Sequence, residues 1–167
     1  MHRLLIACLL PMLAVEVPPT TAAVPHKHVV AVRGLLLCGK QPADNVRVRL
    51  FRTKQNKKDD LNQILDEKIT TKPGTFLLEG NTNGFPLNET HMEPVVSFYH
   101  TCDDDAKNVN KTGYRKFDFH VPKEYVTMGS KPIRTYDLGK LNLQFVFPGE
   151  KRVKNIEEKA GRPSPRK

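Results

Sequence analysis

Histidines can carry chemistry, because imidazole binds metals and transfers protons near neutral pH. His91, His100 and His120 lie in the middle of the chain. None belongs to a His-x-His, His-x-x-x-His or Glu-flanked helical pair, which are the spacings that metal sites use. We therefore expect structural or surface roles, with no metal site and no catalytic residue. His100 stands apart, because it lies beside Cys102 at the end of an apolar run.

Acidic and hydroxyl side chains give no stronger catalytic pattern. Asp103, Asp104 and Asp105 are consecutive, but an EF-hand needs oxygen ligands at alternate positions, a Gly and a distal Glu. Lys107 and Val109 interrupt that pattern. No serine lies in a Gly-x-Ser-x-Gly turn, and no glycine-rich phosphate loop is present. The sequence thus predicts a hydrated acidic loop, no cofactor and no enzyme.

The first residues have the layout of a secretory signal peptide. A short basic start precedes an apolar stretch over residues 4–15, and small residues follow at 20–23. A membrane anchor is the alternative, but it needs about 20 continuous apolar residues. Glu16, Pro18 and Pro19 end this run early. We predict a signal peptide over residues 1–22, a secreted, extracellular protein and no transmembrane segment.

Two cysteines remain once Cys8 leaves with this signal peptide, namely Cys38 and Cys102. An even number of cysteines in an oxidising compartment is typical of a disulfide. Reactive or zinc-binding thiols are the alternative, but neither cysteine has a Cys-x-x-Cys partner or the further ligands that zinc needs. We predict a Cys38–Cys102 disulfide, whose loop of about 65 residues would stabilise the fold by about 4 kcal/mol in the chain-entropy model.

Two N-glycosylation sequons begin at Asn88 and Asn110. Both fall in polar stretches between expected strands, where an acceptor asparagine is exposed. We predict that at least one of them carries a glycan.

The chain is strongly basic, with 27 Lys and Arg against 18 Asp and Glu and a formal charge of +9. Such a balance favours anionic lipid headgroups, sulphated glycans or nucleic acid as partners. No nucleic-acid-binding motif with interleaved aromatic residues is present, so we expect no nucleic-acid partner. Residues 150–167 hold seven Lys and Arg against three Glu, and apolar periodicity stops at residue 149. We predict a disordered basic tail over residues 150–167, with Lys151-Arg152 as surface charge or, alternatively, a processing site.

Residues 23–149 have the pattern of one β domain. Short segments of alternating apolar and polar residues recur, separated by Gly, Pro and Asn turns. This pattern predicts an all-β fold, an antiparallel β-sandwich of seven to eight strands. Residues 28–38 and 46–53 have the pattern of one hairpin, and residues 64–70 and 75–80 that of a second.

The alternation also predicts which side chains are buried. The expected core residues are Val46, Val48, Leu50, Phe117, Phe119, Leu141, Leu143 and Phe145. Their polar neighbours on the same strands, expected to be exposed, are Arg47, Arg49, Asp118 and His120. A one-residue error in register would exchange the two sets.

Several ordered motifs resemble the nematode transthyretin-like family. They are Gly-Leu-Leu-Leu-Cys at residues 34–38, Val-Arg-Val-Arg-Leu at 46–50, Tyr-His-x-Cys at 99–102, Tyr-Asp-Leu-Gly at 136–139 and Phe-Pro-Gly-Glu at 147–150. The resemblance extends from about residue 32 to residue 150. It implies a secreted, transthyretin/prealbumin-like β-sandwich, in a family whose members mostly have no defined activity.

This chain departs from the family pattern in two respects. Members commonly carry a second cysteine pair, and this chain lacks both of those cysteines, which implies that Cys38 pairs with Cys102. The basic tail is the second departure. The related hydroxyisourate hydrolases end in a Tyr-Arg-Gly-Ser signature that this chain also lacks, so hydrolysis is not expected.

We therefore predict a secreted, non-enzymatic binding protein that acts outside the cell, with unassigned ligand-binding residues. The partner expected first is an extracellular protein or an anionic lipid surface. The tail would strengthen attachment to that surface or, alternatively, be an inert solubilising extension. The alternative is a carrier of a small hydrophobic ligand. Electrostatic binding should weaken steeply with salt, whereas burial of an apolar ligand should barely respond.

Overall fold

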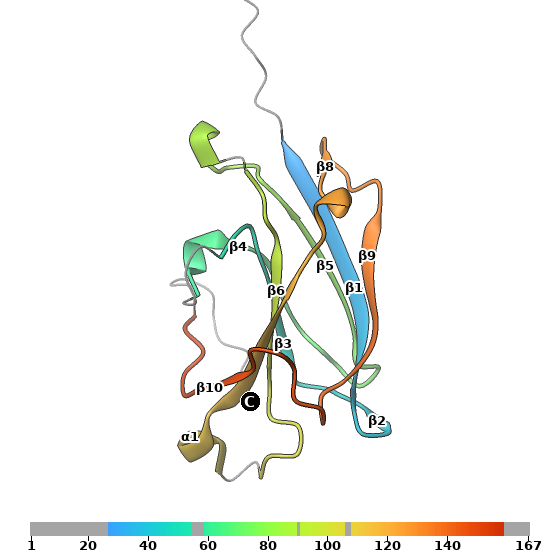
Figure 1. Cartoon of the computed structure of the whole chain (residues 1–167), viewed down its shortest axis with the longest axis vertical. Coiled ribbons are helices and arrows are strands. Elements are labelled where there is room, and N and C mark those ends of the chain that lie inside the picture. The colour runs from blue at the N-terminus through green and yellow to red at the C-terminus, as the bar shows by residue number, and fades with distance from the viewer. Residues whose placement is uncertain (1–26, 55–58, 90, 106–107, 159–167) are drawn as a thin grey trace, which may run out of the picture.

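The computed structural model describes residues 27–54, 59–89, 91–105 and 108–158. Within these residues, two five-stranded sheets face each other as a β-sandwich (Figure 1). The strands are β1 (His28–Cys38), β2 (Gln41–Pro42), β3 (Arg47–Phe51), β4 (Ile64–Ile69), β5 (Thr75–Asn81), β6 (Val95–His100), β7 (Tyr114–His120), β8 (Thr127–Met128), β9 (Thr135–Asn142) and β10 (Lys151–Val153). The short helical turns are η1 (Leu61–Gln63), η2 (Leu87–Glu89), α1 (Val109–Thr112) and η4 (Lys123–Tyr125). The predicted all-β sandwich is confirmed.

The first sheet, which we call sheet A, is built around β1. β5 pairs antiparallel with one side of β1, β9 runs parallel along the other, and the short strands β2 and β8 pair near its two ends. β1 is thus the central strand of sheet A, with a long neighbour along each of its two edges. The register of β1 and β9 shifts between Arg33 and Leu35, opposite Gly139, whose φ is +69°.

The second sheet, sheet B, has the order β10-β7-β6-β3-β4, and all its neighbouring strands are antiparallel. All six residues of its central strand β6 are buried. Residues of β6 that face away from the core must therefore be covered by something outside the sheet.

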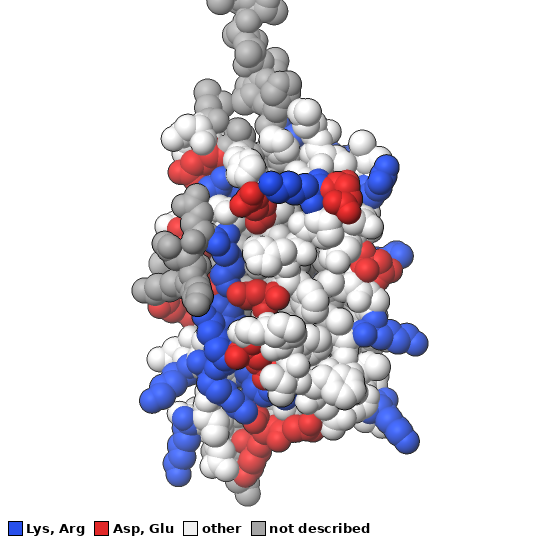
Figure 2. Space-filling view, in the orientation of Figure 1, with Lys and Arg blue, Asp and Glu red and all other residues white. Residues whose placement is uncertain are grey.

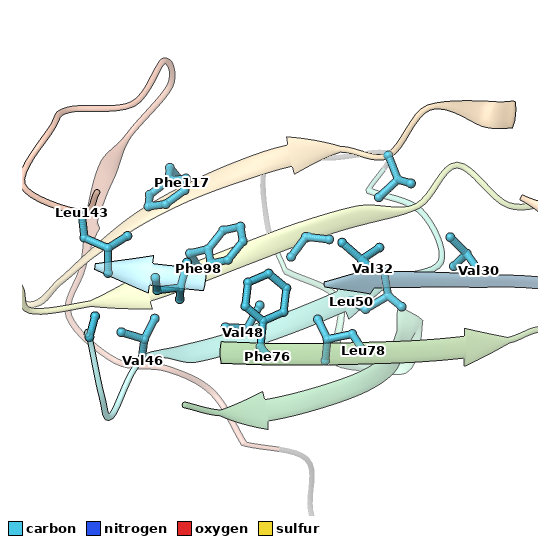
Figure 3. Packing of buried hydrophobic residues seen from close by; sticks show 14 of the residues in the cluster. Val30, Val32, Val46, Val48, Leu50, Phe76, Leu78, Phe98, Phe117 and Leu143 are labelled. Carbon is cyan, nitrogen blue, oxygen red and sulfur yellow. The ribbon is translucent and has the colours of Figure 1, made fainter. Parts of the chain in front are cut away.

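Apolar side chains from both sheets fill the space between them (Figure 3). Phe98 stacks on Phe117 with ring centroids 4.9 Å apart, and Phe76 of sheet A meets Phe98 edge-on at 5.5 Å. Five of the predicted core residues are buried: Val46, Val48, Leu50, Phe117 and Leu143. Phe119 and Leu141 are half-buried and pack against this core.

The two predicted hairpins are wrong in their pairing, although each strand exists. β1 and β3 lie in different sheets, and so do β4 and β5. Alternation shows which face of a strand is apolar but not which strand lies beside it. Both sides of β1 are occupied by β5 and β9, so the chain crosses to sheet B at β3.

Two predictions of side-chain burial are also wrong, since Phe145 was expected to be buried and Arg49 to be exposed. Phe145 is 67% exposed, because β9 ends at Asn142 and the chain turns there, with the Phe145 N–H donating to the Asn142 carbonyl. Arg49 is 1% exposed, because the C-terminal residues and Glu67 cover it. Arg47 and Asp118 are half-buried, and His120 is exposed as predicted.

The folded domain extends past the predicted boundary at residue 149. β10 adds to the edge of sheet B through Lys151 opposite Lys116, and the Glu150 carboxylate accepts from the buried Arg115. The remainder of the predicted tail, residues 159–167, lies outside the described residues, as does the predicted signal peptide. No helix among the described residues is long and apolar enough to cross a membrane.

Candidate functional site

Cys38 and Cys102 form the predicted disulfide. Their Cα atoms are 5.8 Å apart, and the bond joins the end of β1 in sheet A to the second residue after β6 of sheet B. The Asp103 carboxylate lies close to both sulfur atoms. Because the sulfurs are bonded to each other, this group offers no thiolate for a metal ion.

The histidines do not form an acid–base pair. Antiparallel pairing of β6 and β7 places His100 opposite Arg115 and His120 opposite Val95, at opposite ends of the two strands. His100 is buried, its Nδ1 accepts from the Cys102 N–H at 3.3 Å, and its Nε2 has no partner. Burial, reinforced by the charge of Arg115, lowers the pKa of His100 to about 4, so the ring is neutral at physiological pH.

The acidic loop binds cations of the protein itself. Asp104 accepts two hydrogen bonds from the Arg152 guanidinium, at 2.6 and 2.8 Å, and these bonds lower the pKa of its carboxyl. Asp103 accepts from the Gln144 amide at 3.1 Å. The loop therefore fixes β10 and the segment after β9 rather than presenting a set of vacant carboxylates.

The sequon asparagines are exposed, Asn88 in η2 and Asn110 in α1. They precede β6 and β7, which both belong to sheet B. Glycosylation at these positions remains a prediction.

The outer face of sheet A carries an apolar groove of about 590 Å³. Leu77 of β5 is 55% exposed and lies opposite Arg33 of β1, while Leu35 lies opposite Thr75 on one side and Lys140 on the other. Each of the two leucines in the groove thus has a cation as a cross-strand neighbour, Arg33 beside Leu77 and Lys140 beside Leu35.

The two cations of this groove differ in their pairing. Arg33 donates to Asp137 at 2.9 Å, whereas Lys140 is exposed and has no acidic partner among the described residues. In Figure 2, Lys and Arg side chains follow the edge of the molecule where β9 lies, and a second group surrounds β10. Lys140 is therefore available to an anionic group that enters the groove.

The sequence contained a signal for this groove that alternation alone missed. Leu35, Leu36 and Leu37 are consecutive, and so are Phe76, Leu77 and Leu78. Successive side chains of a strand point to opposite faces, so a run of three cannot be buried on one face alone. One apolar side chain of each run must lie on the outer face.

The outer face of sheet B carries a charged network instead. Arg47, Tyr99 and Lys116 are neighbours across β3, β6 and β7, and Arg49, Ser97 and Asp118 form the next row. Asp59, from the loop after β3, accepts hydrogen bonds from Tyr99 Oη at 2.5 Å, from Lys54 at 2.8 Å and from Lys116. These bonds satisfy polar groups that would otherwise be costly to bury.

Burial and charge shift the pKa values in this network. Burial opposes ionisation of Asp59, but hydrogen bonds from Lys116, Lys54 and Tyr99 outweigh it and lower the pKa of Asp59 to about 2. Burial lowers the pKa of Lys116 to about 8, although Asp59 partly offsets the effect. Burial and the neighbouring Asp59 raise the pKa of Tyr99, so its hydroxyl remains a donor.

A buried arginine that the sequence analysis missed holds the segment after β9. Arg115 is 7% exposed and donates to the carbonyls of Leu143 at 3.0 Å and Phe145 at 2.9 Å. It also donates through Nε and Nη2 to both oxygens of Glu150, at 2.6 and 3.1 Å. Arg115 and Phe117 are two residues apart on β7, so their side chains point to the same face. This spacing in the sequence could have indicated that Arg115 points inward.

Comparison with known proteins agrees with this architecture. A model of the transthyretin-like family matches residues 33–122. Transthyretin-like protein 33 of Caenorhabditis elegans is 33% identical over 121 residues, which cover 72% of this chain and 78% of that protein. Transthyretin-like protein 46 of the same organism is 41% identical over 123 residues, covering 74% of this chain. That match spans 64% of the relative, less than two thirds of its length.

A crystal structure of a 9R-lipoxygenase from Cyanothece aligns with 72% of this chain and 18% of the lipoxygenase chain, at 17% sequence identity and a TM-score of 0.36. This similarity is too low to support a structural argument. The family model and the nematode relatives together settle the assignment: the chain belongs to the transthyretin-like family.

Proposed function

We propose that this protein is a secreted, non-enzymatic binding protein that attaches to anionic lipid surfaces through the outer face of sheet A. The observation that carries the proposal is the groove in which exposed Leu77 is the cross-strand neighbour of Arg33, and half-buried Leu35 that of Lys140. Apolar side chains with cations next to them match the chemistry of an anionic amphiphile, whose acyl part is apolar and whose headgroup is charged.

Further cations lie at the end of this face where β1 ends and β5 begins. Lys40 is exposed in the turn after β1, and Lys72 is exposed in the turn before β5. The Leu36 N–H donates to the Gly74 carbonyl, which holds the second turn against β1. Each Lys or Arg near an anionic membrane contributes about 1 kcal/mol to attachment.

The placement of the sequons also supports this orientation. Asn88 and Asn110 both precede strands of sheet B, so glycans there would leave the outer face of sheet A open. Residues 159–167 add four basic residues, Lys159, Arg162, Arg166 and Lys167, which can strengthen attachment without a shaped pocket.

The test is co-sedimentation with vesicles of phosphatidylcholine, with and without phosphatidylserine, at low and physiological salt. Leu77→Glu and Lys140→Glu should each weaken binding by about tenfold, because each puts a negative charge against an anionic surface. Lys111→Glu is the matched control, since Lys111 is exposed in α1 beside sheet B.

The contribution of the tail is tested with a chain that ends at Glu158. A chain that ends at Gly149 would be unsuitable, because it would also delete β10 and the Glu150 carboxylate that binds Arg115. Equal binding of wild type, Leu77→Glu and Lys140→Glu would refute the groove as the attachment site.

A carrier of a small hydrophobic ligand is the second candidate, and the size of the groove favours it. Its volume of about 590 Å³ is within the usual range for small-ligand sites. A fluorescent fatty acid that binds equally in low and high salt, together with no binding to vesicles, would select the carrier function.

A further inference from the structure

The outer face of sheet B, defined by Arg47, Arg49, Tyr99 and Lys116, is covered by the chain itself. Residues 154–158, which we call the C-terminal segment, follow β10 and pass over this face. Arg49 Nη2 donates to the Glu157 backbone carbonyl at 2.7 Å, and Arg47 Nη2 donates to Glu158 Oε1 at 3.0 Å. The face therefore binds one backbone carbonyl and one carboxylate of an extended segment.

The sheet leaves these two arginines short of negative charge. Glu67 of β4 is shared, with Oε1 accepting from Arg47 at 3.1 Å and Oε2 accepting from Arg49 at 2.5 Å. Within the sheet, the two guanidinium groups thus share one carboxylate, and Glu158 of the C-terminal segment provides a second carboxylate. Arg49 is 1% exposed with the C-terminal segment in place, so Glu67 and the Glu157 carbonyl compensate a buried positive charge.

Lys116 on this face and the nearby Lys54 are already paired with aspartates. Lys116 binds Asp59, and Lys54 binds Asp59 and Asp118, each at 2.8 Å. Rows of side chains on neighbouring strands fix these groups across the face. An incoming ligand therefore needs only to satisfy the arginines, as the C-terminal segment does.

The C-terminal segment does not fill the space under it. A cavity of about 150 Å³ lies between the segment and the sheet, lined by Tyr99 and Lys116 from below and by Ile156 from above. Ile156 is half-buried, whereas Asn155, Glu157 and Glu158 are exposed. A peptide with a larger apolar residue at the place of Ile156 would bury more surface on the same face.

We propose that the outer face of sheet B is a binding site for an acidic, extended peptide segment of a partner protein, which residues 155–158 of this chain occupy in its absence. The recognition chemistry is the one already present: an apolar residue over Tyr99, a backbone carbonyl on Arg49 and a carboxylate on Arg47. This site lies on the sheet opposite the lipid groove and does not rest on the proposed function.

The test measures fluorescence anisotropy of a labelled peptide with the sequence of residues 154–159, Lys-Asn-Ile-Glu-Glu-Lys, against the full chain. Glu158→Lys should displace the chain's own segment from Arg47 and raise affinity for the added peptide at least tenfold over wild type. Glu124→Lys is the matched control, because Glu124 is exposed in η4, away from this face. It should leave peptide binding at the wild-type level.

Two further variants separate recognition from general charge. Adding Arg47→Gln to Glu158→Lys should abolish the gain, with the melting temperature measured to confirm folding. A chain that ends at Lys154 keeps β10 and should bind the peptide, whereas a chain that ends at Glu158 should behave like wild type. A peptide with Gln at both Glu positions should bind at least tenfold more weakly.

Equal peptide affinity of wild type and Glu158→Lys would overturn the proposal. Binding of a heparin hexasaccharide but not of the peptide would overturn it as well, because the face would then recognise a sulphated glycan. No lipid is present in the assay, so failure here leaves the groove of sheet A untested and is distinct from failure of the proposed function.

Discussion

Replacing Arg115 with Met tests whether one buried side chain holds the segment between β9 and β10. Arg115 and Glu150 are each 9% exposed in their side chains, and the arginine also donates to two backbone carbonyls. Removing one partner of a buried ion pair costs about 3–5 kcal/mol, because the other charge remains buried without compensation. Folded domains are stable by only about 5–15 kcal/mol, so Arg115→Met should lose at least about a fifth of that stability.

The assay is urea unfolding at neutral pH, followed by a thermal scan in which a decrease of about 10–20 °C is expected. The double variant Arg115→Met/Glu150→Gln should recover part of the loss, since no carboxylate is left unpaired. A loss below about 1 kcal/mol, or a double variant as unstable as the single one, would refute the argument from the buried charge.

The same variant should alter the pH dependence of stability. In the folded protein, burial raises the pKa of Glu150, but the hydrogen bonds from Arg115 and from the Phe147 N–H outweigh it, and the net pKa is lowered. A carboxyl group with a lowered pKa in the folded state stabilises the fold at pH values above its unfolded pKa of about 4.3, and this stabilisation is lost as the pH falls. The difference between wild type and Arg115→Met should therefore be largest at neutral pH and shrink in acid.

Three further predictions concern stability. Replacing both Cys38 and Cys102 with Ser should cost about 4 kcal/mol in urea unfolding if the chain-entropy model holds, and reductant should then have no further effect. Phe117→Ala should cost about 3–5 kcal/mol and Phe119→Ala less, because Phe117 is buried and Phe119 only half-buried; equal costs in the same assay would contradict this ranking. Asp59 should contribute about 2 kcal/mol above about pH 4, and this contribution should disappear between pH 4 and its folded pKa of about 2. A pH titration of unfolding free energy that is the same for wild type and Asp59→Asn would show that the lowered pKa does not stabilise the fold.

The alternation of apolar residues was sufficient to predict the sandwich and part of its core. Val46, just before β3, and Val48 and Leu50 within it are buried because they point to the same side, and that side follows from the period of a strand alone. The disulfide was also predictable, because only two cysteines lie outside the predicted signal peptide.

The partners of each strand depended on the tertiary structure. The short turn after β1 leads into the two-residue strand β2, which does pair with β1, but the next strand, β3, lies in sheet B. The turn after β4 likewise leads to a strand of the other sheet, β5. The pairing of β1 depends on the whole sheet, since β5 and β9 lie along its two edges. Such contacts join residues far apart in sequence, so no local sequence pattern predicts them.

The charged residues show the same division between sequence and structure. The sequence determined that Arg47 and Arg49 lie on the face of β3 opposite the core. Only the tertiary structure decided that this face is not open to water, because Glu67 and the C-terminal segment approach it from distant parts of the chain. The parity of a residue on a strand sets its direction, whereas its burial depends on what packs over it.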